Sequence, residues 1–294
     1  MALGILIGGI GLALTIAMGC VAAFRPGTVP SLAGWAGSRS WLRLDRLRLA
    51  RAQLTESVGP IGAFVLLLGG GVLAVSAAGA LFGFGVAAIE HPVDWWAFHL
   101  SDRLRAHGWA RVMNVVTQTG NIPETRTAGV AMSVVLAFVA GRRRWWAPGV
   151  LILSVILVEK YQQSMLATIV DRGHPPTTLG TYPSGGCARL ITIYGAILFV
   201  VLELTRAGRR TRILTWTVLW AGAFVEGYSR WYLNKHWITD VLGGWFYGGL
   251  LLAVVVFAGR AMTLRGEEST PAAEAATDAT TGARTDPVGS ISRT

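Results

Sequence analysis

The sequence holds seven apolar stretches, and each approaches the length of a helix that crosses a bilayer. A transmembrane helix needs about 20 predominantly apolar residues. The chain is 52% hydrophobic and only 14% charged, a balance that water-soluble globular domains do not have. The sequence therefore predicts an all-α, polytopic membrane helical bundle. The stretches cover roughly residues 3–24, 61–89, 126–140, 147–170, 186–204, 213–229 and 237–259.

The basic residues predict how these helices are oriented. The net charge of +10 comes almost wholly from arginine, and the arginines fall in short clusters between the apolar stretches rather than in one basic domain. This distribution indicates membrane topology, and we expect no nucleic-acid partner. The clusters occupy every second loop, which the positive-inside rule makes cytoplasmic, although Arg103, Arg105 and Arg111 in an outer loop run against the trend. We expect a multi-pass protein of the cell (plasma) membrane, with its N-terminus outside and its C-terminal tail in the cytoplasm.

Composition along the chain predicts one membrane domain with two additions. Residues 1–60 should form an N-terminal transmembrane helix and a basic cytoplasmic linker, in which "WLRLDRLRLAR" fits either an amphipathic surface helix or a solvated loop. Residues 61–259 should form the membrane core. Residues 260–294 are mostly small and polar, cannot bury a core, and are expected to be disordered. Aromatic and charged residues alternate within 90–125, as in a helix that lies in the membrane interface.

Two outer connections carry the residues that suggest chemistry, "DRGHPPTTLGTYPSGGCAR" at 171–189 and "GYSRWYLNKHW" at 227–237. Both join helix ends on the same predicted side, so they can meet over one cleft. Arg172 and Arg230 are permanent cations whose guanidinium groups fork onto phosphate oxygens. The sequence thus fits a phosphate site, and it equally fits an ordinary turn with two interfacial arginines.

The turn "PSGG" at 183–186 directly precedes a predicted helix. Ser184 can act as its N-cap, while Gly185 and Gly186 allow the backbone to approach a ligand and direct N–H groups at it.

His236 and Asp240 are four residues apart and lie on one face of a predicted helix start. A carboxylate one turn away can hold one imidazole nitrogen and leave the other free to attack. A helix-terminal histidine beside a capping aspartate is the alternative interpretation.

The run Ser229-Arg230, five residues, His236, three residues, Asp240 resembles the third motif of the type-2 phosphatidic acid phosphatase (PAP2) superfamily, S-R-x5-H-x3-D. The order of parts is also similar, with an arginine-containing motif, then P-S-G-x, then S-R…H…D. The resemblance covers roughly 61–259 and implies a six-helix PAP2-like core with an extra N-terminal helix. It implies no metal and no cofactor.

The resemblance also implies roles for individual residues. His236 would be the nucleophile that forms a phosphohistidine, and Asp240 would orient it. The phosphoryl group would be bound by Arg172, Ser184, Gly185, Gly186 and Arg230.

Three positions depart from the family pattern. His174 stands where the first motif, K-x6-R-P, has its arginine, and Ala167 stands where it has its lysine. Gly186 replaces the histidine of P-S-G-H, which protonates the leaving oxygen in the family. His174 on the neighbouring loop could supply that proton, or could simply contact phosphate or cap the turn.

The missing acid predicts a substrate preference. A general acid contributes about 10²–10⁴-fold, and an alkoxide leaving group needs it more than a phosphate, whose second pKa is about 6. We expect a membrane lipid-phosphate phosphatase that prefers polyprenyl diphosphate-type substrates, with membrane lipids around it. The alternatives are a catalytically degenerate PAP2-like lipid-binding protein and a phosphoryl or head-group transferase on lipids. The oligomeric state is not predicted.

Three charged residues fall inside predicted spans, namely Glu159, Lys160 and Glu226. Intramembrane charges mark a functional pathway or an internal pair. We expect Lys160 to pair with Glu159 or Glu226, or to reach the membrane surface.

Overall fold

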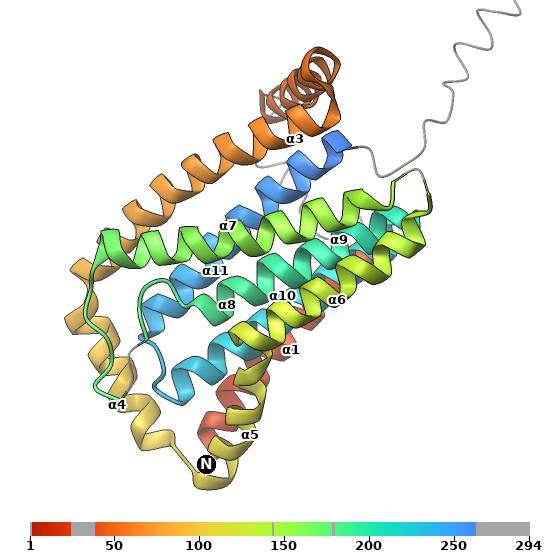
Figure 1. Cartoon of the computed structure of the whole chain (residues 1–294). Coiled ribbons are helices and arrows are strands. Elements are labelled where there is room, and N and C mark those ends of the chain that lie inside the picture. The colour runs from red at the N-terminus through yellow and green to blue at the C-terminus, as the bar shows by residue number, and fades with distance from the viewer. Residues whose placement is uncertain (1, 25–38, 143, 178–179, 263–294) are drawn as a thin grey trace, which may run out of the picture. The chain divides into compact units, whose positions relative to one another are not determined.

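The computed structural model describes residues 2–24, 39–142, 144–177 and 180–262, with the backbone alone at 2–7, 20–24 and 39–45. Every regular element within these residues is helical (Figure 1). The long helices are α1 (Ala2–Phe24), α3 (Arg39–Ala88), α6 (Ile122–Ala140), α7 (Trp146–Val170), α10 (Arg209–Tyr232) and α11 (Ile238–Gly259). The shorter elements are η1 (Glu90–Asp94), α4 (Trp95–Leu104), α5 (His107–Val116), η2 (Thr117–Gly120), α8 (Gly185–Arg189), η3 (Leu190–Tyr194), α9 (Gly195–Leu204) and η4 (Arg260–Met262).

Five helices of the described part are long and apolar enough to cross a membrane: Arg46–Ala88, Ile122–Ala140, Trp146–Val170, Gly185–Leu204 and Ile238–Met262. They coincide with five of the predicted stretches. Ile122–Ala140 starts four residues before the short stretch 126–140 because Pro123 near its first turn opens the helix earlier. The stretch 213–229 lies within α10, whose arginines and Glu226 make it more polar than the other five. The predicted all-α, multi-pass membrane bundle is confirmed.

The outer surfaces of these helices are strongly apolar. Phe138 is 83% exposed, Leu73 and Leu81 are each 73% exposed, and Val218 is 69% exposed. Contiguous exposed apolar surface of this kind marks contact with a non-aqueous phase or a partner. Since the same helices have membrane-spanning length, these side chains fit contact with lipid.

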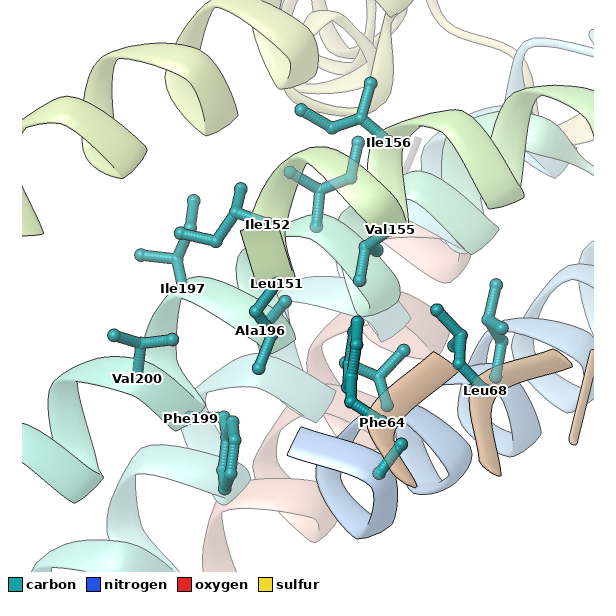
Figure 2. Close-up of a cluster of buried hydrophobic side chains, with 14 of the residues drawn as sticks. Phe64, Leu68, Leu151, Ile152, Val155, Ile156, Ala196, Ile197, Phe199 and Val200 are labelled. Carbon is teal, nitrogen blue, oxygen red and sulfur yellow. The ribbon is translucent and has the colours of Figure 1, made fainter. Parts of the chain in front are cut away.

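The centre of the bundle is a packed apolar cluster formed by α3, α7, α9 and α11 (Figure 2). Leu151, Ile152 and Val155 of α7 are fully buried, and Phe199 and Val200 of α9 pack with them. Interiors are packed as densely as organic crystals, so this cluster fixes the spacing of the helices whose ends carry the site. Phe64 and Leu68 bring α3 onto the same cluster.

Helix α3 is interrupted by a kink at Gly59, where φ is +75°, followed by Pro60. Proline lacks the N–H that the helix needs and displaces the preceding turn, while glycine tolerates a positive φ. The segment "WLRLDRLRLAR" before the kink is helical, which decides between the helix and the loop left open above. Parts of the predicted linker, residues 25–38, and of the predicted tail, residues 263–294, lie outside the described residues.

One end of the bundle gathers the segments that matter for function. The α4 and α5 region, the connection after α7, and the connection between α10 and α11 lie at this end, together with the start of α1 (Figure 1). The connections after α6 and after α9 lie at the opposite end. Alternate connections therefore share a side, as the predicted spans require.

Candidate active site

Asp240 lies in the first turn of α11 and joins three parts of the site. Its Oδ2 accepts the backbone N–H of Trp237 at 3.2 Å, which caps the helix. Its main-chain carbonyl accepts the N–H of Ser184 at 2.9 Å. The turn before α8 is thereby hydrogen-bonded to the start of α11, and the two predicted outer connections do meet.

His236 stands beside Asp240, as the four-residue spacing predicts. The distance from His236 Nδ1 to Asp240 Oδ2 is 3.6 Å, slightly longer than a hydrogen bond. The imidazole is 11% exposed and the carboxylate is fully buried. The arrangement directs Nδ1 at the carboxylate, so Nε2 is the nitrogen that remains available to a reactant.

The connection after α7 lies over the turn that carries His236. Thr177 donates its hydroxyl hydrogen to the Asn234 carbonyl at 2.7 Å, and the indole N–H of Trp237 donates to the Gly173 carbonyl at 2.9 Å. A Cβ built on Gly180 would stand 2.9 Å from His236 Nδ1. The same Cβ would collide with the backbone carbonyl of Lys235, so a side chain at position 180 would displace the turn that carries the imidazole.

Close packing of small residues holds α8 against α11. A Cβ on Gly244 would stand 2.6 Å from the Ser184 carbonyl, and a Cβ on Gly248 would stand 3.0 Å from Ala188 Cα. Small residues four apart let membrane helices approach closely. This contact places Ser184 next to the first turn of α11.

Ser184 is the N-cap residue of α8, but its hydroxyl makes no cap hydrogen bond. The hydroxyl is fully buried, makes no hydrogen bond to a nitrogen or oxygen atom within the described residues, and lies against the thiol of Cys187. The predicted position is correct, whereas the predicted cap bond is not formed. A thiol is a weak hydrogen-bond partner, so this hydroxyl can still bind a ligand that reaches it.

Arg230 lies against Gly186. A Cβ on Gly186 would stand 2.5 Å from Arg230 Nη2 and 2.7 Å from Nε. The guanidinium donates from Nε to Glu226 Oε1 at 2.7 Å, and from Nη2 to the Thr117 carbonyl at 2.9 Å and to Asn121 Oδ1 at 3.0 Å. Arg230 is thus near the predicted turn, with its charge already compensated by a carboxylate.

Arg189 makes a similar contact with Gly185. A Cβ on Gly185 would stand 2.7 Å from Arg189 Nη1. Arg189 also donates to the Gly120 carbonyl at 3.1 Å and lies 3.6 Å from Glu159 Oε1. The two glycines of "PSGG" therefore leave space for two guanidinium groups.

Arg172 is surrounded by carboxylates. Its side chain is 2% exposed, and its Nη2 lies 2.5 Å from Asp94 Oδ2. Its Nε lies 3.5 Å from Glu90 Oε2 and 3.7 Å from Asp240 Oδ1. The structure brings Arg172 to the site, on the far side of Asp240 from the imidazole. Its phosphate-binding role stays a prediction, and it requires the guanidinium to exchange a carboxylate for phosphate.

His174 is exposed, and its Nδ1 lies 3.0 Å from the carbonyl of Pro175. Among the contacts of the described residues, none joins His174 to His236. The prediction that His174 supplies a proton therefore depends on movement of its loop.

Burial is the main cause of the pKa shifts of three side chains outside the spanning helices. Burial raises the pKa of Glu90, although neighbouring Arg172 opposes the shift. Burial, and secondarily Asp240, raises the pKa of Tyr182. Burial, and secondarily Arg230, lowers the pKa of Lys235 beside His236. Each of these three shifts favours the uncharged form of the side chain.

The charged residues inside predicted spans pair differently from the sequence expectation. Glu159 lies beside Arg189, and Glu226 pairs with Arg230. Lys160 is exposed, with its ammonium 5.2 Å from the centre of the Tyr161 ring. Of the two expectations for Lys160, the pairing with Glu159 or Glu226 is not formed, because the side chain leaves α7 on its outer face; the alternative, that it reaches the membrane surface, stays a prediction.

Two residues of the site were not anticipated, Asp94 and Thr239. Asp94 is fully buried in η1 and accepts both the N–H and the hydroxyl of Thr239. Asp94 comes from the outer segment 90–125, and nothing in its local sequence indicates a partner 145 residues away. The pair Glu226 and Arg230, by contrast, has the i,i+4 spacing that could have been read from the sequence.

The described residues contain no cluster of three or more His, Cys, Asp and Glu side chains that could hold a metal ion. An apolar cavity of about 410 Å³ lies beside the site, between α4, α10 and α11, and its lining includes Val93, Trp231 and Val241. These three residues neighbour Asp94, Arg230 and Asp240 in sequence.

Comparison with known proteins agrees with the helical arrangement. The sequence profile described as the PAP2 superfamily matches residues 150–261, which contain every predicted site residue. No curated protein sequence matches the chain. A similar solved structure is described as the crystal structure of the first transmembrane PAP2 type phosphatidylglycerolphosphate phosphatase from Bacillus subtilis. It is 23% identical, with a TM-score of 0.52, and the match covers 61% of this chain and 93% of that one. The predicted resemblance is confirmed: residues 150–261 match the PAP2 superfamily profile, and the helical fold is similar to that of a transmembrane PAP2 protein.

Proposed function

We propose that the protein is a membrane phosphatase that cleaves a lipid-linked phosphate through a phosphohistidine on His236. The observation that carries the proposal is the placement of His236 Nδ1 3.6 Å from a fully buried carboxylate, Asp240, at a helix start. The match to the PAP2 superfamily profile, and the fold shared with a transmembrane PAP2 type phosphatase, support the same class of reaction.

The chemistry follows from that geometry. With its proton on Nδ1 facing Asp240, the imidazole attacks phosphorus through Nε2. The N–P bond forms as the bond from phosphorus to the leaving oxygen breaks, and Asp240 stabilises the positive charge that develops on the ring. Water then attacks the phosphohistidine, which releases inorganic phosphate and restores the neutral imidazole.

The space at Gly186 supports a preference among substrates. Glycine at position 186 has no side chain that could protonate the leaving group, and Arg230 fills the volume beside it. When His236 attacks the terminal phosphorus of a prenyl diphosphate, the leaving group is the prenyl monophosphate, which needs this proton less than an alkoxide does. Polyprenyl diphosphate-type lipids are therefore the proposed substrates.

The location of the reaction is also a proposal. The connections that carry Arg172, Ser184 and His236 share one end of the bundle, opposite the connection after α6, which carries Arg142 and Arg144. By the positive-inside rule this end faces the outer leaflet of the cell membrane, and the C-terminal tail faces the cytoplasm.

The test is phosphate release by purified protein in detergent micelles. Farnesyl diphosphate and a short-chain phosphatidate serve as substrates for wild type, His236→Ala and the control His107→Ala. His107 is an exposed histidine at the start of α5. We expect faster release from the diphosphate, loss of release with His236→Ala, and no loss with His107→Ala. Equal rates in all three proteins would refute the proposal.

A second candidate function is favoured by one observation, the compensation of both predicted phosphate-binding arginines. Arg172 and Arg230 are paired with Asp94 and Glu226. Catalysis requires a cation that can stabilise the negative charge of the transition state, whereas a protein that only binds lipid phosphate does not. Two arginines already paired with carboxylates therefore fit a protein that binds without turnover. The two functions differ in whether acid-labile phosphate accumulates on His236 after incubation with labelled substrate.

A further inference from the structure

We propose that Asp94 is a positioning residue for the nucleophile, acting through Arg172 and Asp240. The inference rests on the proposed function of His236. Asp94 lies in η1, outside the region that the superfamily profile matches. No motif discussed above includes it.

Asp94 is fully buried and holds three donors at once. Its Oδ1 accepts the N–H of Thr239 at 3.0 Å, and its Oδ2 accepts the Thr239 hydroxyl at 2.6 Å and Arg172 Nη2 at 2.5 Å. The Thr239 hydroxyl in turn accepts from Arg172 Nη1 at 2.8 Å. Charge-assisted bonds of this kind are short and directional, so Asp94 fixes both the guanidinium and the residue that precedes Asp240.

Arg172 transmits this constraint to Asp240. Its two Nη atoms are engaged by Asp94 and Thr239, and only Nε faces Asp240, at 3.7 Å from Oδ1. This distance exceeds a hydrogen bond. Asp240 therefore keeps Oδ2 directed at His236 and at the N–H of Trp237 rather than rotating onto the guanidinium.

Loss of the Asp94 charge would release that restraint. Arg172 would then be compensated by Glu90 and Asp240 alone. A guanidinium turned onto Asp240 would draw the carboxylate away from the imidazole, and His236 would lose the group that orients it. The substitution Asp94→Asn removes the charge and keeps an oxygen that can accept the Thr239 N–H, so the helix start retains its cap.

A double-mutant cycle tests whether Asp94 acts through Asp240. Farnesyl diphosphate turnover is measured for wild type, Asp94→Asn, Asp240→Asn and the double variant. We expect Asp94→Asn to lower kcat about tenfold, with KM changed less, as loss of a charge-assisted bond at a reacting group predicts. In the Asp240→Asn background the same substitution should change kcat less than twofold, because residues that act as one unit are not additive.

Three further variants separate positioning from folding. Thr239→Val removes the hydroxyl and should reproduce the loss of kcat, whereas Thr239→Ser keeps the hydroxyl and should lower kcat less than Thr239→Val does. Asp102→Asn is the matched control, since Asp102 lies in the same outer segment with a side chain 63% exposed. It should leave kcat unchanged. An equal loss from Asp94→Asn in both Asp240 backgrounds would overturn the inference.

A second readout does not depend on turnover. The rate at which diethyl pyrocarbonate modifies His236 is followed by peptide mass spectrometry, with His107 as internal reference. Asp94→Asn should slow modification of His236 at least threefold relative to His107, and only when Asp240 is present. If wild type releases no phosphate but this coupling is observed, the proposed function fails and the positioning role stands. If His236 reactivity is unchanged by Asp94→Asn, the positioning role fails whatever the activity.

Discussion

The guanidinium of Arg230 occupies the space that a side chain at position 186 would enter, with Nη2 2.5 Å from the ideal Cβ position. The glycine at 186 and the buried arginine are therefore one structural unit. The guanidinium is held in this space by Glu226, Thr117 and Asn121, so a histidine at position 186 would collide with it.

The substitution Gly186→Ala should destabilise the protein by about 1–3 kcal/mol, since overpacking a fixed interior has this effect. Arg230 cannot move without breaking its bonds to Glu226 and Asn121. Gly108→Ala is the matched control, because nothing lies within 4 Å of a Cβ at that helical position. Denaturant unfolding in detergent measures both, and equal stability of the two variants would contradict the packing argument.

The substitution Glu226→Gln should destabilise the protein by about 3–5 kcal/mol, because it leaves Arg230 buried with its main anionic partner removed. Millimolar inorganic phosphate should recover part of this loss if the guanidinium can accept phosphate in place of the carboxylate. Thermal unfolding with and without phosphate is the measurement. Glu124→Gln on the exposed face of α6 should show neither effect.

The substitution Asp240→Asn should lower phosphate release by about 10³-fold or more, because the imidazole loses the carboxylate that selects its tautomer. His236 Nδ1 would then face an amide at the distance of 3.6 Å. Rapid-quench detection of phosphohistidine distinguishes slower attack from slower hydrolysis. Wild-type phosphohistidine formation in this variant would exclude Asp240 from the first step.

Glu90 makes a pH-dependent contribution to stability. Burial raises its pKa above the ordinary value of 4.5 against the opposing effect of Arg172. A raised folded-state pKa favours folding below the unfolded pKa, and this contribution is lost as pH rises through the folded-state pKa. The thermal midpoint of Glu90→Gln, relative to wild type, should therefore increase as pH is raised from about 4 to about 7. If the difference in thermal midpoint between Glu90→Gln and wild type stays constant over this pH range, burial does not raise the pKa of Glu90.

The sequence was sufficient for features that depend on local pattern. The length of the apolar stretches alone predicted α7 and α11 to within two residues at their ends, because the thickness of the bilayer sets the length of a helix that crosses it. The spacing of His236 and Asp240 predicted their proximity, but not the reason for it: His236 lies in the turn before α11 and only Asp240 lies on the helix, so the two residues do not share a helix face.

Features that depend on long-range partners could not be read from the sequence. Arg172 is interpreted as a phosphate ligand from its charge, yet its compensation by Asp94 depends on how η1 packs. Asp94 reaches Thr239 only because the outer segment folds back over the start of α11. Such contacts depend on tertiary packing, which the pattern of apolar residues in one sequence does not predict.

The hydrogen bond from the Ser184 N–H to the Asp240 carbonyl couples the turn before α8 to the first turn of α11. Under the proposed function, a lipid head group that shifts the turn would also shift Asp240, the carboxylate that faces the imidazole. A poorly fitting head group would then misalign the ring as well as bind weakly.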